Sequence, residues 1–247
     1  SDVYKRQEKG MSFDEALKIA QEKGYAEKDP TADVEGHDAC RKVCILASLA
    51  FGKHVYPNQV ETEGITNITL EDVSYIENAG GVIKLLGQIK YINDNEIAAF
   101  VSPAVVYNGS QLASVKDVFN AILVRGDAVG DVCFYGPGAG KLPTASAVVA
   151  DIIDCAKHSE RKKIFGWGAG AEDYVVDYKE RIEMPFYVRA KATPAEINAK
   201  FSDVKFLSRK GQPSDEVAFI TDIMTENKLN KKLDGINVIN TIKVTNY

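Results

Sequence analysis

The pattern of hydrophobic and polar positions predicts alternating helices and strands over residues 12–158. Three amphipathic stretches, each bounded by a capping residue or a glycine, predict helices at 12–24, 36–51 and 69–79. Two apolar runs separated by the turn residues 93–95 predict strands at 82–92 and 96–106. A short helix at 114–119, strands at 121–124 and 131–135, and a helix at 144–157 with Thr144 as its cap are predicted to follow.

From residue 185 the chain shows a second pattern of short elements. Strands are predicted at 186–190, 204–207 and 237–244, with one helix beginning at Thr193 and another at 214–228. About sixty residues are close to the lower size limit for a domain that folds alone. The charged, glycine-rich residues 159–184 are interpreted as a linker, and the aperiodic residues 1–11 as a non-native or disordered leader.

Composition and charge narrow the class of protein. The formal net charge of −5 gives no electrostatic basis for binding nucleic acid. The chain has no apolar run of roughly 18 residues that could span a membrane, so a cytoplasmic protein is expected. Cys40 and Cys44 stand one helical turn apart, but we interpret all four cysteines as small hydrophobic residues and predict no metal site.

Eight charged residues gather in the stretch GYAEKDPTADVEGHDACRK, residues 24–42, directly before the apolar run VCILASLAF. Asp38 and Lys42 stand at i and i+4 on the predicted helix. One interpretation is an exposed ion pair worth a few tenths of a kcal/mol. The other is a lysine that donates a proton, surrounded by carboxylates that hold an amino group. Spacing alone leaves both interpretations open.

The amino-acid sequence of this stretch resembles the substrate motif of homoserine dehydrogenases, GYAE-x-DP-x-x-D-x-x-G-x-D-x-x-x-K. The resemblance continues in VIKLLGQIK, FNAILVRGDAVGD and FYGPGAGKLPTASAVVADI, and covers about residues 12–157. It implies an α/β fold in which a mixed sheet, with helices packed on one face, forms the catalytic and dimerisation domain at 12–158. It also implies a homodimer that interconverts L-homoserine and L-aspartate 4-semialdehyde, on the route to threonine, isoleucine and methionine.

The resemblance assigns roles residue by residue. Lys42 matches the family's catalytic lysine, which gives a proton to the aldehyde oxygen. The matching substrate-binding acids are Glu27, Asp33 and Asp38. A developing alkoxide is stabilised by a cationic donor, and an ammonium by carboxylates. The rival interpretation is a regulatory or amino-acid-binding protein that kept the fold and lost the chemistry.

Gly24 and Gly140 match backbone positions that the family's NAD or NADP cofactor approaches. A side chain there would block a close approach. The family's nucleotide-binding domain, with its GxGxxG motif, has no counterpart before Gly24, so we expect the isolated chain to be inactive. The later GWGAG at 166–170 follows no buried strand and is not interpreted as a dinucleotide site. Without its usual neighbour, the helix at 144–157 is expected to expose an apolar face or to find a partner.

Residues 185–247 resemble an ACT domain, a small ferredoxin-like α+β module that often carries amino-acid feedback control in this family. Tyr187-Val188-Arg189 matches the usual YYLR of its first strand. The usual D-x-PG-V-L turn is reduced to residues 192–195, ATPA, without its glycine. A threonine effector at this ACT-like domain is therefore an expectation that this turn calls into question.

Overall fold

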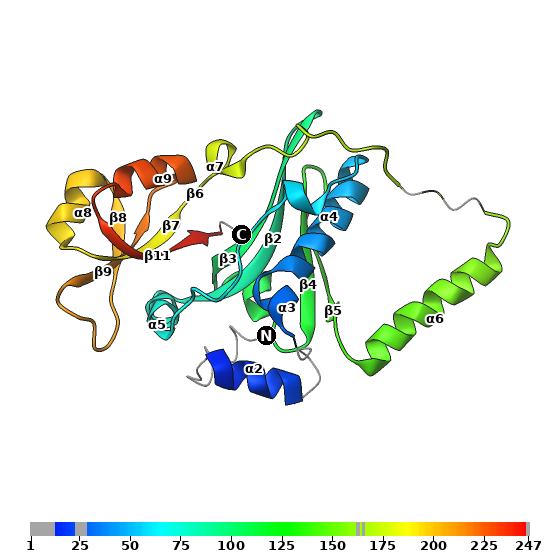
Figure 1. Ribbon diagram of the computed structural model, residues 1–247, viewed down its shortest axis with the longest axis horizontal. Coiled ribbons are helices and arrows are strands. Elements are labelled where there is room, and N and C mark those ends of the chain that lie inside the picture. The colour runs from blue at the N-terminus through cyan, green and yellow to red at the C-terminus, as the bar shows by residue number, and fades with distance from the viewer. Residues whose placement is uncertain (1–12, 23–28, 162–163, 165, 246–247) are drawn as a thin grey trace.

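A seven-stranded mixed sheet runs through both halves of the protein (Figure 1). The computed structural model describes residues 13–22, 29–161, 164 and 166–245. The strand order is β1-β3-β11-β7-β9-β8, with β2 paired to the other edge of β3. This mixed sheet with helices is the α/β class that the sequence predicts.

The first half is organised around a long hairpin. Its strands β2 (Gly81–Asn93) and β3 (Glu96–Tyr107) pair antiparallel from Gly81–Tyr107 to Asn93–Glu96. Helix α4 (His37–Phe51) packs on one face of this hairpin, and α5 (Leu70–Asn78) packs on the same face farther along. The prediction of helices on one face is therefore confirmed. The shorter elements here are α2 (Phe13–Glu22), α3 (Thr31–Val34), β1 (Glu61–Thr62) and two 3-10 turns at Pro57–Gln59 and Gln111–Ser114.

The second half follows the order strand, helix, strand, strand, helix, strand. These elements are β7 (Phe186–Lys191), α8 (Pro194–Lys200), β8 (Val204–Leu207), β9 (Glu216–Thr221), α9 (Glu226–Leu233) and β11 (Asn237–Val244). Helices α8 and α9 cover the sheet face opposite to α4 and α5. The final strand β11 pairs antiparallel with β7 and parallel with β3. Sequence patterns did not predict that the two halves share one sheet.

Residues 168–178 of the segment interpreted as a linker pack against the first half. Lys53 bridges to Gly168, and Ile97 bridges to Val175. Tyr174 is buried here, and the segment ends in α7 (Tyr178–Arg181) and β6 (Glu183–Met184), which pairs with β10 (Met224–Thr225). Residues 171–177, directly after GWGAG, form no helix, and Gly170 lies tightly against the carbonyl of His54. This glycine therefore serves packing.

Three predicted elements are corrected by the structure. The helix predicted at 114–119 is absent, because the chain makes its 3-10 turn earlier, at Gln111–Ser114, and enters β4 (Phe119–Gly126). Helix α6 (Lys141–Lys157) begins three residues before Thr144, with Pro143 in the first turn, where a missing N–H costs nothing. Within the region predicted as a helix at 214–228, the structure has strand β9. All six residues of β9 are buried, and it lies between β7 and β8 in the sheet. Its β-branched and aromatic side chains favour a strand in such a position.

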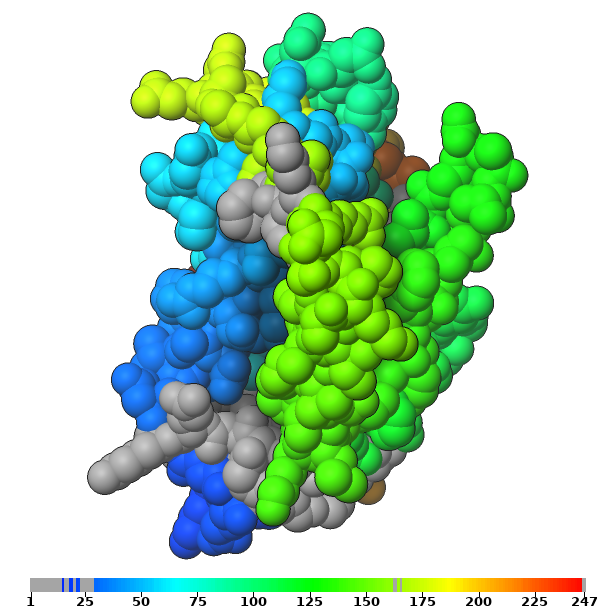
Figure 2. All heavy atoms as spheres, turned by 90° about the vertical axis from the view of Figure 1, so that its right-hand side faces the viewer, coloured from blue at the N-terminus to red at the C-terminus, as the bar shows by residue number. Residues whose placement is uncertain are grey.

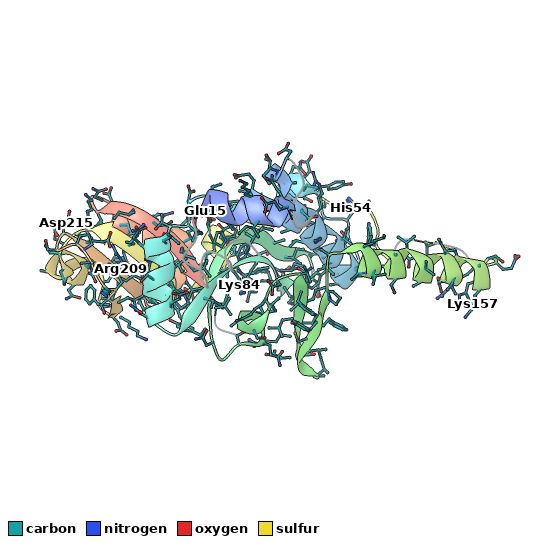
Figure 3. All side chains as sticks on the ribbon, turned by 90° about the horizontal axis from the view of Figure 1, so that it is seen from below. Glu15, His54, Lys84, Lys157, Arg209 and Asp215 are labelled. Carbon is teal, nitrogen blue, oxygen red and sulfur yellow. The ribbon has the colours of Figure 1, made fainter. Side chains whose placement is uncertain are left out.

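Helix α6 projects away from the sheet (Figure 1). It follows β5 (Gly130–Pro137), which pairs only with β4 among the described strands. Helix α6 buries none of its residues, and Leu142 and Ile152 are 79% and 61% exposed. It fills much of the face seen in Figure 2, and Figure 3 places Lys157 at the end of the molecule opposite Arg209 and Asp215. The apolar face expected from the sequence is therefore exposed in this chain.

Candidate functional site

The described part of the charged stretch, residues 29–42, folds into a helical corner that places α4 against the sheet. Asp29 accepts hydrogen bonds from the backbone N–H and the hydroxyl of Thr31, and these bonds lower the pKa of its carboxyl. Gly36, between α3 and α4, has a φ of +80°. A Cβ at this position would lie 3.1 Å from Thr62 Cγ2. Glycine is thus required here both by backbone conformation and by the close approach of β1.

Asp38 and Lys42 form an ion pair on the exposed side of α4. Lys42 Nζ lies 2.7 Å from Asp38 Oδ2, and their side chains are 62% and 46% exposed. The opposite side of the helix carries Cys40, Val43 and Cys44 into an apolar cluster. An exposed i,i+4 pair contributes only about 0.3–0.5 kcal/mol to stability. The fold therefore does not depend on these two charges, which remain accessible to a small molecule.

The structure brings together only part of the predicted site. Asp33 lies in α3, is exposed, and is joined to α4 through the hydrogen bond from Gly36 N–H to the Asp33 carbonyl. Gly24 and Glu27 lie outside the described residues. Gly140 is the N-cap of α6 and so lies on a different element from Asp33, Asp38 and Lys42. Its φ is +115°, and no side chain caps the helix.

Cys40 and Cys44 are free thiols within the apolar cluster. Burial, and then the neighbouring Cys40, raise the pKa of Cys44 to about 12. A thiol with so high a pKa is a poor metal ligand and a poor nucleophile, because both roles need the thiolate. Within the described part of the chain, no three His, Cys, Asp or Glu side chains are placed to hold a metal ion. No described helix has the length and apolar character that crossing a bilayer requires.

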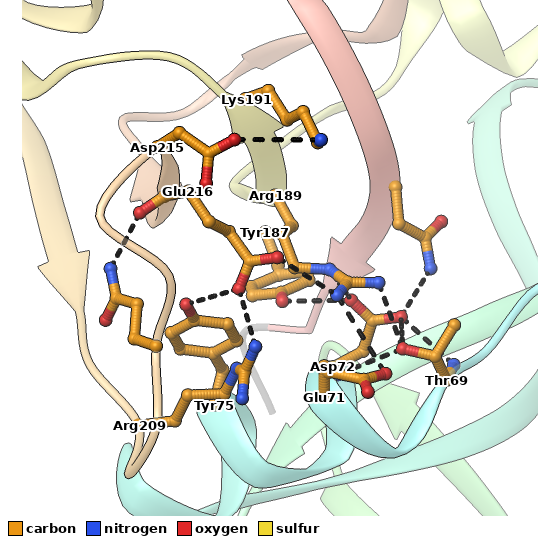
Figure 4. Close-up of polar contacts among 12 residues, drawn as sticks. Thr69, Glu71, Asp72, Tyr75, Tyr187, Arg189, Lys191, Arg209, Asp215 and Glu216 are labelled. Carbon is orange, nitrogen blue, oxygen red and sulfur yellow. Dashed lines mark hydrogen bonds and ion pairs between the residues drawn. The ribbon is translucent and has the colours of Figure 1, made fainter.

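A buried network of charges, which sequence reasoning missed, joins α5 to the C-terminal strands (Figure 4). Asp72 is fully buried, and its Oδ1 lies 2.8 Å from Arg189 Nε. The same carboxylate accepts hydrogen bonds from Tyr187 and Asn240 at 3.0 and 2.8 Å. Arg189 Nη1 also lies 3.5 Å from Glu216 Oε2, which extends the network to strand β9. Asp72 lies more than a hundred positions in the sequence from Tyr187, Arg189 and Asn240, so no local pattern could have paired it with them.

The carboxylate of Glu216 is the second centre of this network. It accepts hydrogen bonds from the Tyr75 hydroxyl at 2.8 Å and from Arg209 at 2.9 Å. Burial, followed by the contact with Glu216, raises the pKa of Tyr75 to about 12. The only sign of this network in the sequence was the pair Thr69 and Asp72, which form the capping box of α5. That pair indicated where a helix begins, but not that Asp72 would contact residues of the C-terminal strands.

Comparison with known proteins identifies the relatives of this chain. The homoserine dehydrogenase family model matches residues 3–153. A homoserine dehydrogenase of Bacillus subtilis (strain 168) is 44% identical over 146 residues, covering 59% of this chain and 34% of that protein. One from Synechocystis sp. (strain ATCC 27184 / PCC 6803 / Kazusa) is 47% identical over 148 residues, with the same two coverages.

Solved structures extend the similarity through the C-terminal half. A homoserine dehydrogenase from Thiobacillus denitrificans superposes with a TM-score of 0.82 at 32% identity, covering 98% of this chain and 61% of that one. The S. aureus enzyme gives a TM-score of 0.80 at 32% identity, covering 99% of this chain and 62% of that one. This chain spans about a third of the length of the curated relatives that it matches. It belongs to the homoserine dehydrogenase family.

Proposed function

We propose that this chain supplies the substrate-binding and proton-donating part of a homoserine dehydrogenase, which interconverts L-homoserine and L-aspartate 4-semialdehyde. The observation that carries the proposal is the Asp38–Lys42 pair, 2.7 Å apart and accessible on α4. It lies within the family match, which covers residues 3–153. An exposed pair of this kind contributes little to stability, and its two residues match the acid and the lysine of the family's substrate motif.

In this proposal Lys42 Nζ gives its proton to the aldehyde oxygen as that oxygen becomes an alcohol, and accepts the proton in the reverse reaction. Asp38 holds the lysine ammonium in position through their 2.7 Å contact. Asp33 and Glu27 bind the ammonium of the substrate, because carboxylates accept strong hydrogen bonds from a cationic donor. Because the Asp38 and Lys42 side chains are exposed, a substrate can reach both of them.

A nicotinamide cofactor, NAD or NADP, supplies the hydride when bound. The part of this chain that fits such a group is the N-terminus of α6, whose first N–H groups have no side-chain cap. A Cβ at Gly140 would meet only Pro143, at 3.6 Å, so the backbone is open to an approaching ligand. Gly140 and Gly24 are the positions that we assign to this contact. Because they offer a small surface, we propose that the isolated chain turns over no homoserine.

Further features of the family belong to the same proposal. The order of elements in residues 185–247 and the strand order β11-β7-β9-β8 support an ACT-like unit, and with it a threonine effector. The exposed strands β4 and β5, with Ile122 and Phe134 each more than 40% exposed, support a homodimer. Four free cysteines support a cytoplasmic location. In the same proposal, the L-homoserine that is formed serves the synthesis of threonine, methionine and isoleucine.

The proposal is tested in a longer protein. Residues 12–157 replace the matching segment of the Bacillus subtilis relative, and homoserine oxidation is followed by the absorbance of the reduced cofactor at alkaline pH. We expect turnover by the chimera and none by the 247-residue chain. A folded chimera without activity would favour a protein that kept the fold and lost the chemistry.

A further inference from the structure

The strap, residues 166–175, crosses the C-terminal end of α4 (Figure 1). His54 N–H donates a hydrogen bond to the Gly168 carbonyl at 3.0 Å, and Gly168 N–H donates to the Gly52 carbonyl at 2.9 Å. A side-chain bond lies beside them, from Trp167 Nε1 to His54 Nδ1, at 2.9 Å. His54 therefore holds the start of the strap through its backbone and through its imidazole ring.

The side-chain bond requires an uncharged His54. An indole nitrogen can only donate, so His54 Nδ1 must accept, and the ring proton lies on Nε2. When the imidazole gains a second proton, both of its nitrogens carry N–H, and two donors then face each other across 2.9 Å. Histidine normally changes its charge between pH 5 and 8. Acidification through that range therefore breaks the contact between His54 and Trp167.

Among the described residues, no ion pair compensates for that loss. The titratable side chains next to His54 and on the strap are Lys53, Tyr56, Glu172, Asp173 and Tyr174. Both acids are exposed, and neither pairs with His54. Lys53 Nζ lies 4.6 Å from the ring centroid of Tyr174, and the Tyr56 ring meets the imidazole edge to face, with centroids 4.2 Å apart. The last turn of α4 and the turn at Pro57–Gln59 carry no titratable side chain. A charge on His54 thus gains no described partner that would keep the strap closed.

The far end of the strap is anchored by groups that do not titrate in this range. Ile97 N–H donates to the Tyr174 carbonyl at 3.0 Å, and Gln59 Nε2 donates to the Ala171 carbonyl at 2.8 Å. The Tyr174 side chain is buried. These contacts leave residues 166–169 as the part of the strap that depends on the imidazole.

We propose that His54 and Trp167 form a pH-sensitive clasp, which holds residues 166–169 on α4 when His54 is neutral and releases them when it is protonated. The closed arrangement binds one proton fewer than the open one, so a lower pH shifts the population toward the open arrangement. The inference goes beyond the proposed function and does not depend on it, because the strap is observed without turnover.

Opening changes the side of α4 that carries Lys42. A Cβ at Gly166 would lie 3.5 Å from Leu49 Cδ2, so the start of the strap borders Leu49. Leu49 stands two helical turns beyond Lys42, about 10 Å along the same side of the helix. Release of the strap therefore uncovers more of this side.

The test is acrylamide quenching of tryptophan fluorescence in the 247-residue chain at pH 8 and at pH 6. Trp167 is the only tryptophan in the chain, so the emission reports on the clasp alone. We expect the quenching constant to rise about twofold at pH 6, because the released indole meets the quencher more often, and to return when pH 8 is restored. A quenching constant that is the same at both pH values would overturn the proposal.

Two variants separate the clasp from other effects of acid. His54→Asn places an amide oxygen near the position of Nδ1, and that oxygen accepts a hydrogen bond at every pH. Its quenching constant should therefore be the same at pH 8 and pH 6. His158→Gln, which removes an exposed histidine at the end of α6, is the matched control and should respond to pH as the parent does. A parent-like rise in folded His54→Asn, or its absence in His158→Gln, would contradict the assignment to His54.

Hydrogen exchange shows whether the backbone moves as well. The amides of His54 and Gly168 form the bonds between the strap and the end of α4. After correction for intrinsic rates, both should exchange faster at pH 6 than at pH 8 in the parent chain. Equal corrected rates would reduce the fluorescence result to quenching by the imidazolium and would overturn the release of the strap. This measurement needs no variant, so it keeps the proposal falsifiable should His54→Asn fail to fold.

Discussion

Replacing Arg189 by methionine tests whether the buried charge network fastens α5 to the C-terminal strands. The Arg189 side chain is 5% exposed and lies 2.8 Å from Asp72 Oδ1, 3.0 Å from the Thr69 hydroxyl and 3.5 Å from Glu216 Oε2. Methionine keeps most of the apolar stem and removes the charge. Asp72 then stays fully buried without a cationic partner.

Removing one partner of a buried ion pair typically costs about 3–5 kcal/mol. Arg189 Nε has no hydrogen bond of good geometry despite its close contact with Asp72, and Tyr187 and Asn240 continue to donate to that carboxylate. We therefore expect the lower end, about 3 kcal/mol in the free energy of unfolding. For a chain of this length that corresponds to a melting temperature lower by about 6–12 °C.

The assay is chemical denaturation followed by circular dichroism, with thermal melting beside it. The matched control is Lys191→Met on the same strand, where the ion pair with Asp215 spans 3.6 Å and the side chains are 59% and 64% exposed. That change should cost less than about 1 kcal/mol. The double variant Arg189→Met with Asp72→Asn should be less destabilised than the sum of its parts. A loss for Arg189→Met no larger than for Lys191→Met would refute the reasoning.

Three further predictions concern packing, pH and surface. Gly87→Ala should cost about 1–3 kcal/mol, because the new Cβ would lie 2.2 Å from Val43 Cγ2, whereas Gly136→Ala, with nothing within 4 Å, should change stability by less than about 1 kcal/mol; denaturant midpoints decide. Because the pKa of Tyr75 is raised from 10 to about 12, the folded state keeps the phenol proton at a pH where the unfolded chain loses it, so the free energy of unfolding should fall between pH 10 and 12. In thermal melts across that range, the stability of the Tyr75→Phe variant should fall less steeply than that of the parent. Ile152→Glu on α6 should reduce binding of a hydrophobic dye and leave stability within about 0.5 kcal/mol, and equal dye binding would contradict an exposed apolar face.

Local signals in the sequence predicted most helix ends and strands correctly. The helix predicted at 36–51 lies at His37–Phe51, because Gly36 and Gly52 both adopt left-handed conformations that end regular structure. The predicted strands 204–207 and 237–244 match the structure to the residue. The helix predicted at 214–228 was wrong where the structure has strand β9, because a short apolar run fits either a helix or a strand until its neighbours are known.

The long-range arrangement was beyond the sequence pattern. The parallel pairing of β11 with β3, at Lys243–Ala104, joins segments about 140 positions apart and has no local signature. The buried Asp72–Arg189 pair depends on that same arrangement. Spacing also could not choose between an ion pair and a proton donor for Asp38 and Lys42, because both roles need the same 2.7 Å contact. The residues of the motif at 24–42 predicted the homoserine dehydrogenase family, and the family model that matches residues 3–153 confirmed this prediction.

The most direct test of the account is homoserine oxidation by the chimera with Lys42→Ala, beside Arg41→Ala as the control. Both residues are exposed cations on α4, one position apart, so loss of charge or helix stability affects them alike. Loss of a proton donor should lower kcat by about 10²–10⁴-fold for Lys42→Ala, while Arg41→Ala keeps the activity of the parent. Equal activity in the two variants would contradict the assignment of Lys42 and return the Asp38–Lys42 contact to a surface ion pair.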